Sequence, residues 1–119
     1  MAMRTGHGRR IVFVMLLALI AVPGAGAEPR VIELALLNGR LPEDRRVVRV
    51  SQGDEVTLRW TTDRPLTVHL HGYDIETKLS PGTSVSTRFT ARATGRFAIE
   101  VHGDRGEERI VAYLEVHPR

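Results

Sequence analysis

Short runs that alternate apolar and polar residues, divided by turn residues, fill the chain from residue 31 onward. In one such run Val56, Leu58 and Trp60 share a face of the chain, and polar residues stand between them. Alternation with a period of two is typical of half-buried strands. The pattern predicts about seven strands, at Val31–Leu37, Arg46–Val50, Glu55–Thr61, Leu66–His71, Ser84–Phe89, Arg96–His102 and Arg109–Val116.

Short strands at near-regular spacing, without a useful stretch of helical periodicity, indicate an all-β Greek-key β-sandwich. The 119 residues suffice for one small domain and are too few for two. We expect a core built from the apolar face of each strand: Val56, Leu58, Trp60, Val68, Leu70, Phe89, Phe97, Ile99, Val101 and Leu114.

The first 27 residues differ in character from the rest of the chain. Three arginines precede the 12-residue apolar run Ile11–Val22, and Ala25–Ala27 supplies a small-x-small cleavage pattern. The run is shorter than the roughly 20 residues that a bilayer span needs. Residues 1–27 are therefore predicted to be a signal peptide, with residues 28–119 exported to the periplasm or secreted. An uncleaved anchor is the alternative, and Arg9-Arg10 leaves twin-arginine export open.

Charge and sulfur content narrow the function classes further. The formal charge of +3 comes from residues 1–27, because 14 basic residues face 14 acidic ones from Glu28 onward. We therefore expect no nucleic-acid partner, since a polyanion-binding domain would carry its own basic excess. The chain has no Cys, and all three Met lie within residues 1–27. The predicted exported domain thus has neither disulfides nor sulfur ligands.

The order of the motifs resembles that of the cupredoxins, the blue-copper sandwich family. Val47–Leu58 resembles their v-x-v-x-x-G-D-x-V-x-x segment, and a His-bearing strand, Val68–His71, follows. A Pro-Gly turn at Pro81-Gly82 precedes the next strand, and Gly95–Val101 is similar to their Gly-x-Tyr-x-Phe-x-Cys strand. The resemblance spans Val31–His117 and implies a cupredoxin-like fold.

The copper ligands of that family are largely missing from this sequence. Val101 stands at the Cys position, no Met occurs downstream, and only His69 or His71 matches a ligand position. A blue-copper centre needs a thiolate together with two imidazoles. We therefore expect a cupredoxin-like module that is not a blue-copper electron carrier.

Two histidines offer different metal chemistry. His69 and His71 are two residues apart on a predicted strand, so both point to one face. Such His-x-His pairs can chelate Cu or Zn. His102 is a candidate third metal ligand, although it alternates out of phase with Val101 and is expected to face away from the Cys position. The alternative is that His69 is a hydrogen-bonded structural histidine and that His71 only opens a turn.

For two acidic residues near these histidines, Asp74 and Glu100, the sequence allows more than one role. Asp74 could orient a ligating histidine from behind or cap a turn. Glu100 projects on the side of His102 and could join a metal site or serve as a surface charge. No nucleophile motif or phosphate-binding loop is present, and Asp54-Glu55 and Glu107-Glu108 are interpreted as loop carboxylates without an apolar setting.

These observations favour an exported, non-enzymatic cupredoxin-like module that binds Cu(II) or another divalent metal ion through His69 and His71, with His102. The alternative is a metal-free structural or interaction domain of a cell-envelope complex, whose partner the sequence does not name. In either case we expect no stable membrane span after signal cleavage.

Overall fold

The computed structural model describes residues 3, 8 and 28–119. Apart from Met3 and Gly8, the predicted signal peptide at residues 1–27 lies outside the described residues. Within the described part of the chain, no helix is long and apolar enough to cross a membrane.

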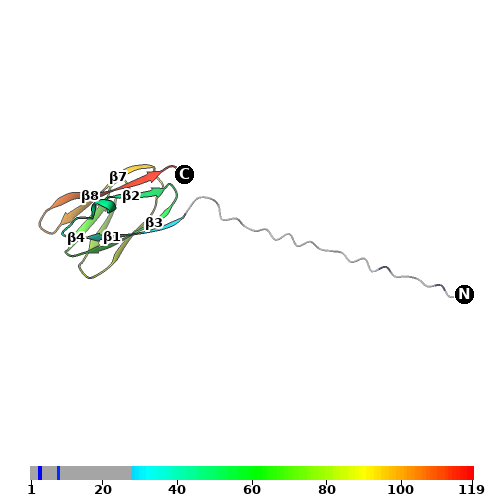
Figure 1. Ribbon diagram of the computed structural model, residues 1–119, viewed down its shortest axis with the longest axis horizontal. Helices are drawn as coiled ribbons and strands as arrows, with labels where there is room; N and C mark the ends of the chain where they lie inside the picture. Colours follow the sequence, from blue (N-terminus) through cyan, green and yellow to red (C-terminus); the bar gives the residue numbers. More distant parts are fainter. Residues whose placement is uncertain (1–2, 4–7, 9–27) are drawn as a thin grey trace.

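Eight strands form two facing sheets (Figure 1). The three-stranded sheet has the order β1-β3-β6, and the five-stranded sheet has the order β2-β8-β7-β4-β5. The pairs β1–β3 and β2–β8 are parallel, and the other pairs are antiparallel. The strands are β1 (Pro29–Leu36), β2 (Val47–Ser51), β3 (Glu55–Thr62), β4 (Leu66–Leu70), β5 (Ile75–Leu79), β6 (Val85–Thr90), β7 (Gly95–Gly103) and β8 (Glu108–His117), with a 3-10 turn η1 (Glu43–Arg45) before β2.

The predicted all-β sandwich is confirmed, and each of the seven predicted strands is present with ends that differ by at most two residues. The strand β5 was not predicted. Its centre, Glu76-Thr77-Lys78, is a run of three polar residues that carries little apolar alternation. It is nevertheless a strand because it pairs along β4 at the edge of the five-stranded sheet, where one face needs no apolar cover.

Eight of the ten predicted core residues are buried between the sheets, with Trp60 and Leu114 wholly enclosed. The indole N–H of Trp60 donates to Thr87 Oγ1 at 3.1 Å, so this buried donor is satisfied. Phe89 and Phe97 were placed in the core, and that detail is wrong, because both are only half-buried. They pack around Tyr73, whose ring centroid lies 4.9 Å from that of Phe89 and 5.1 Å from that of Phe97.

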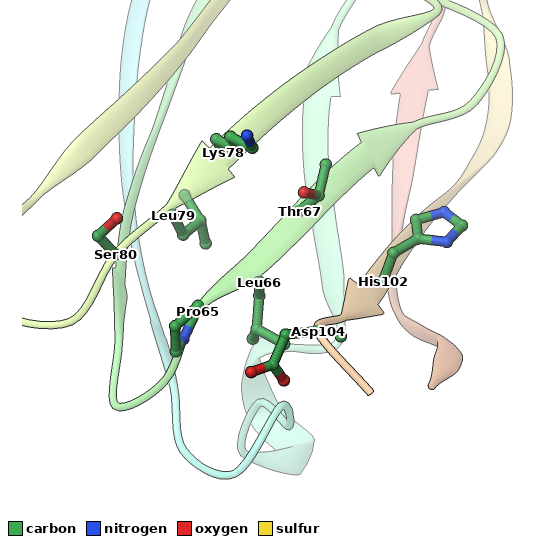
Figure 2. Close-up of a pocket in the computed structure, with 9 residues that line it drawn as sticks. Pro65, Leu66, Thr67, Lys78, Leu79, Ser80, His102 and Asp104 are labelled. Carbon is green, nitrogen blue, oxygen red and sulfur yellow. The ribbon is translucent and has the colours of Figure 1, made fainter. Parts of the chain in front are cut away.

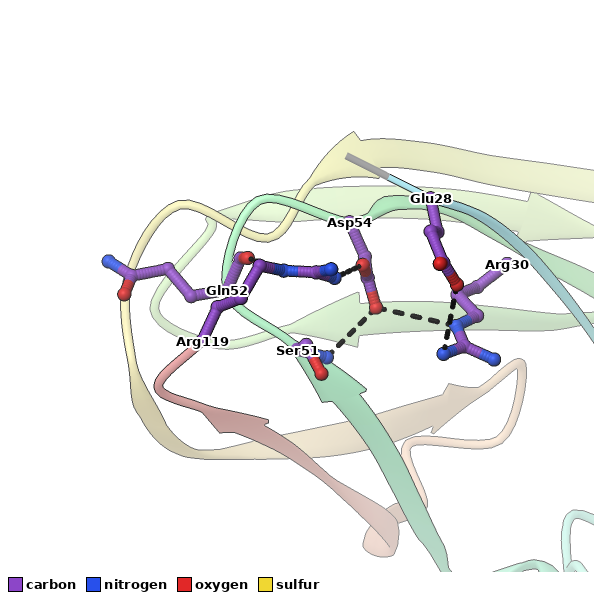
Figure 3. A network of polar contacts seen from close by, with 6 residues as sticks. All are labelled: Glu28, Arg30, Ser51, Gln52, Asp54 and Arg119. Atoms are coloured by element: carbon purple, nitrogen blue, oxygen red, sulfur yellow. Dashed lines mark hydrogen bonds and ion pairs between the residues drawn. The ribbon is translucent and has the colours of Figure 1, made fainter. Parts of the chain in front are cut away.

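Asp54, in the turn between β2 and β3, is fully buried, which the sequence does not predict, but polar partners surround its carboxylate, in line with the expectation that it has no apolar setting. Its carboxylate accepts the Ser51 N–H at 2.9 Å and pairs with Arg30 at 3.4 Å and with Arg119 (Figure 3). Burial raises the pKa of Asp54, but the Ser51 amide and the Arg119 and Arg30 charges outweigh it, so the pKa lies below its usual value. Asp54 thereby joins β1 to the segment after β8, which meet at one end of the sandwich (Figure 1).

Candidate metal site on the outer face of the five-stranded sheet

Strand alternation decides which side chains of β4 and β7 face away from the core. Val68 and Leu70 of β4 are buried, so His69 between them lies on the outer face. In β7 Val101 is buried, which places Glu100 and His102 on the same outer face. The expectation that His102 faces away from the family's Cys position is therefore confirmed.

The antiparallel register of β4 and β7 brings these outer-face residues together. His69 lies directly opposite Glu100, and Thr67 lies opposite His102. His71 follows the end of β4, and its backbone N–H donates to the Ala98 carbonyl at 2.9 Å, which continues the pairing by one step. The imidazoles of two strands thus share one surface with the Glu100 carboxylate between them.

The predicted pair His69 and His71 is adjacent in space, with ring centroids 4.3 Å apart. His71 Nε2 lies 2.8 Å from Glu100 Oε2, and His69 Nε2 lies 3.2 Å from Asp74 Oδ1. The His69 side chain is 19% exposed and that of His71 is 44% exposed, so His71 is the more accessible of the two rings. The contact with His69 places Asp74 where it could orient that imidazole, which is one of the two roles that the sequence leaves open for it.

His102 sits beside that pair, with its ring centroid 6.4 Å from that of His69. Its Nδ1 lies 3.3 Å from Glu108 Oε1, and its Nε2 lies 4.0 Å from Glu100 Oε1. One donor atom each from Glu100, His102 and Glu108 falls within 4.8 Å of the others, a spacing that one ion could span. We call His69, His71, Glu100, His102 and Glu108 the histidine patch.

Glu108 was missed as a candidate metal ligand because the sequence places it beside Glu107 in an apparent charged loop. The structure extends β8 back to Glu108, which then lies opposite His102 in the register with β7. A bulge at Ile99/Glu100 shifts the pairing by one residue, and this shift puts Glu108 on the outer face. No pattern in the sequence predicts that bulge.

The surroundings of the histidine patch carry a negative balance. Glu76 of β5 lies opposite His69 on the other side of β4, and Asp74 contacts His69. Lys78 of β5, opposite Thr67, is the single Lys of the chain. Four carboxylates, those of Asp74, Glu76, Glu100 and Glu108, therefore stand around three imidazoles and one ammonium, which favours a cation over an anion.

A pocket of about 380 Å³ adjoins the patch at the ends of β4, β5 and β7. His102 and Ser80 lie at opposite sides of the group of lining residues, with Leu66 and Leu79 between them (Figure 2). Lys78 and Asp104 also line the pocket, so it borders the His102 side of the patch with both apolar and charged side chains.

The interior of the sandwich does not fit a blue-copper centre. Val101, at the Cys position implied by the resemblance, is buried in the hydrophobic core. The chain has no Cys, and residues 28–119 have no Met, so no thiolate is available. The imidazoles of His69, His71 and His102 lie on the outer face of the sheet instead.

Comparison with known proteins agrees with the sandwich. No family model matches the chain, and no curated protein matches it. Among solved structures, a copper-binding protein in its apo form superposes with a TM-score of 0.61 at 10% identity, over 75% of this chain and 88% of that one. A multi-copper oxidase from Pseudomonas thermotolerans gives 0.60 at 22% identity, over 79% and 31%. A copper nitrite reductase from Nitrosomonas europaea gives 0.56 at 18% identity, over 77% and 42%.

These likenesses identify the fold as cupredoxin-like, as the sequence resemblance implies. The chain spans less than two thirds of the oxidase and reductase chains, 31% and 42% in these two cases. At such identities the superpositions establish the architecture of the domain. Its chemistry has to be inferred from the residues of this chain.

Proposed function

We propose that this chain is an exported, non-enzymatic cupredoxin-like module that binds a divalent metal ion, Cu(II) above all, at the histidine patch. The observation that carries the proposal is the convergence of three imidazoles and Glu100 on one sheet face, with His71 Nε2 only 2.8 Å from the Glu100 carboxylate. The copper-binding proteins that share the fold lend it further support.

The ligand types favour Cu(II) for chemical reasons. Imidazole nitrogen and carboxylate oxygen suit Cu(II) and Zn(II), and Cu(II) generally forms the more stable complexes among divalent first-row ions. Cu(I) prefers thiolate and thioether ligands, which residues 28–119 lack.

A metal titration tests the proposal directly. The full 119-residue chain is expressed, purified without a histidine tag, and titrated with Cu(II) and with Zn(II) while thermal unfolding is followed. An ion that binds only the folded state stabilises it by about 2.7 kcal/mol when its free concentration is 100 times Kd. We expect a saturable rise in Tm, larger for Cu(II), that is lost in a His69→Ala, His71→Ala double variant.

His117→Ala is the matched control, because His117 is exposed at the end of β8 and lies near Glu115 rather than in the histidine patch. That variant should keep the full metal response. The absence of any saturable shift below millimolar metal would contradict the proposal and favour the metal-free interaction domain. A strong blue charge-transfer band would also contradict it, because the chain has no thiolate to produce one.

A further inference from the structure

A second pocket, of about 120 Å³, lies where the segment before β2 runs alongside the start of β8. Among the described residues, no acid lines this pocket. Its lining consists of three arginines and three aliphatic residues: Arg40, Arg46, Arg109, Leu41, Ile110 and Val111. We call it the arginine pocket. Its charge is opposite to that of the carboxylates around the histidine patch, so it calls for a different kind of ligand.

Strand pairing explains why a pocket forms at this place. β2 pairs with β8 only from Tyr113 onward. Val111 is left out of the pairing between β8 and β7, at the bulge described above. The segment from Arg40 to Arg46 therefore runs along a part of β8 that β2 does not cover, and the pocket lies between them. Leu41 and Val111 are buried, so the core fixes two of its aliphatic residues.

The fold also holds two of the three arginines in place. Arg109 lies opposite the buried Val101 in the register of β7 and β8, so it stands on the core side of β8, where it is half-buried. Arg46 Nε donates to the Leu41 carbonyl at 3.3 Å. A guanidinium has five N–H donors, so this hydrogen bond leaves most of the Arg46 head available for a ligand.

None of the three arginines has a carboxylate partner among the residues that the structure describes. The neighbouring acids of β8 are engaged elsewhere, since Glu107 pairs with Arg64 and Glu108 lies 3.3 Å from His102. Like charges around one small pocket repel one another, and an anion bound between them removes that repulsion. The arginines of residues 28–119 that do form ion pairs are Arg30, Arg49, Arg59, Arg64 and Arg119.

Two exposed aliphatic side chains flank the arginine pocket. Ile110 is 49% exposed and lines it. Leu37 is 67% exposed and pairs with Arg40 across a two-residue turn, so both side chains emerge on the same side of that turn. A free inorganic anion has no use for such neighbours, whereas a polypeptide can cover them while it presents an anionic group to the arginines. Arginine is also enriched at protein interfaces.

We propose that the arginine pocket binds a carboxylate of an acidic polypeptide segment, with Leu37 and Ile110 in contact with apolar side chains beside that carboxylate. The planar guanidinium fork matches a carboxylate in a bidentate manner. Residues 28–119 have 14 basic and 14 acidic residues, which disfavours an extended polyanion such as a nucleic acid. The inference is independent of metal binding at the histidine patch and adds a partner of stated chemistry to the module.

The experiment measures binding of a short fluorescein-labelled peptide of alternating Glu and Leu by fluorescence anisotropy. The protein is the full untagged chain, kept metal-free with EDTA. We expect saturable binding that weakens as the salt concentration rises, because exposed charges are screened. The same labelled peptide with Gln in place of Glu should bind at least about tenfold more weakly, since it loses the charge-assisted hydrogen bonds.

Variants assign the binding to the arginine pocket. Arg46→Gln and Arg109→Gln should each weaken the peptide about tenfold or more. Arg109→Lys keeps the charge without the fork and should fall between the parent chain and Arg109→Gln. Arg88→Gln is the matched control, because Arg88 is an exposed arginine on β6 of the other sheet and its loss changes the net charge equally. Thermal unfolding of each variant checks that it is folded.

The outcomes are distinguishable from those of the metal titration. Absence of saturable peptide binding overturns the proposal, as does an equal loss of affinity in Arg88→Gln and in the pocket variants. Inorganic phosphate or sulfate that binds while the peptide does not would reduce the pocket to a simple anion site and also overturn it. Metal binding at the histidine patch stands or fails separately, because the peptide is measured without metal.

Discussion

Replacing Asp54 by Asn tests how the two ends of the domain are held together. The carboxylate is fully buried, and it accepts the Ser51 N–H and pairs with the guanidinium groups of Arg30 and Arg119. Asn keeps an oxygen for Ser51 but removes the negative charge. Because the side chains of Arg30 and Arg119 are 50% and 32% exposed, each weakened pair should cost about 1 kcal/mol. The expected loss is about 2 kcal/mol of unfolding free energy.

Asp54→Ala should cost more than Asp54→Asn, because it also leaves the Ser51 N–H without its acceptor. A buried donor without a partner costs about 1–3 kcal/mol, which brings the total to about 4 kcal/mol. Urea denaturation of both variants and the parent chain measures these free energies. An Asn variant as stable as the parent would refute the role of the charge, and equal losses for Asn and Ala would refute the role of the Ser51 hydrogen bond.

The Asp54 contribution should also depend on pH with a definite sign. The folded state lowers the pKa of Asp54 from an ordinary value of 3.8, so below that value the unfolded chain takes up a proton before the folded one does. The stabilisation is therefore complete above the unfolded pKa and is lost as the pH falls through the lower folded pKa. The difference between parent and Asp54→Asn should be constant near neutral pH and shrink below pH 3.8. A difference that stays unchanged into that acidic range would refute the electrostatic account.

Two further predictions concern the core and the turn after β4, and both are checked by urea denaturation. Trp60→Ala should lower the free energy of unfolding by about 3–5 kcal/mol. Thr87→Val removes the acceptor of the Trp60 indole N–H and should lower it by about 1–3 kcal/mol. Thr87→Ser keeps the hydroxyl acceptor and should lower it much less. Gly72→Ala should cost clearly more than Gly82→Ala: both glycines have positive φ, +82° and +78°, but only at Gly72 would a Cβ collide with a side chain, the Phe97 ring. Equal costs at the two glycines would contradict the close packing of Phe97 on Gly72.

The architecture of this protein could be read from its sequence because it depends on local alternation. Period-two patterns placed seven strands within two residues of their observed ends and identified Trp60 and Leu114 as core. The same alternation put His69 and His71 on one face and His102 out of phase with Val101. The strand β5 was not predicted from the sequence. Its centre of Glu, Thr and Lys has no apolar alternation, and pairing with its neighbour β4 determines its conformation.

What only the tertiary structure decided was which distant residues meet. The register between β4 and β7 set His69 opposite Glu100, and a bulge in the β7–β8 pairing brought Glu108 to His102. Burial of Asp54 likewise depends on Arg30 and Arg119, which are 24 and 65 residues away along the chain. The composition of the chain excluded a thiolate copper centre, because absent atoms cannot be supplied by folding. The arrangement of the imidazoles and carboxylates required the fold, because strand register is a property of pairs of segments and is not written in either segment alone.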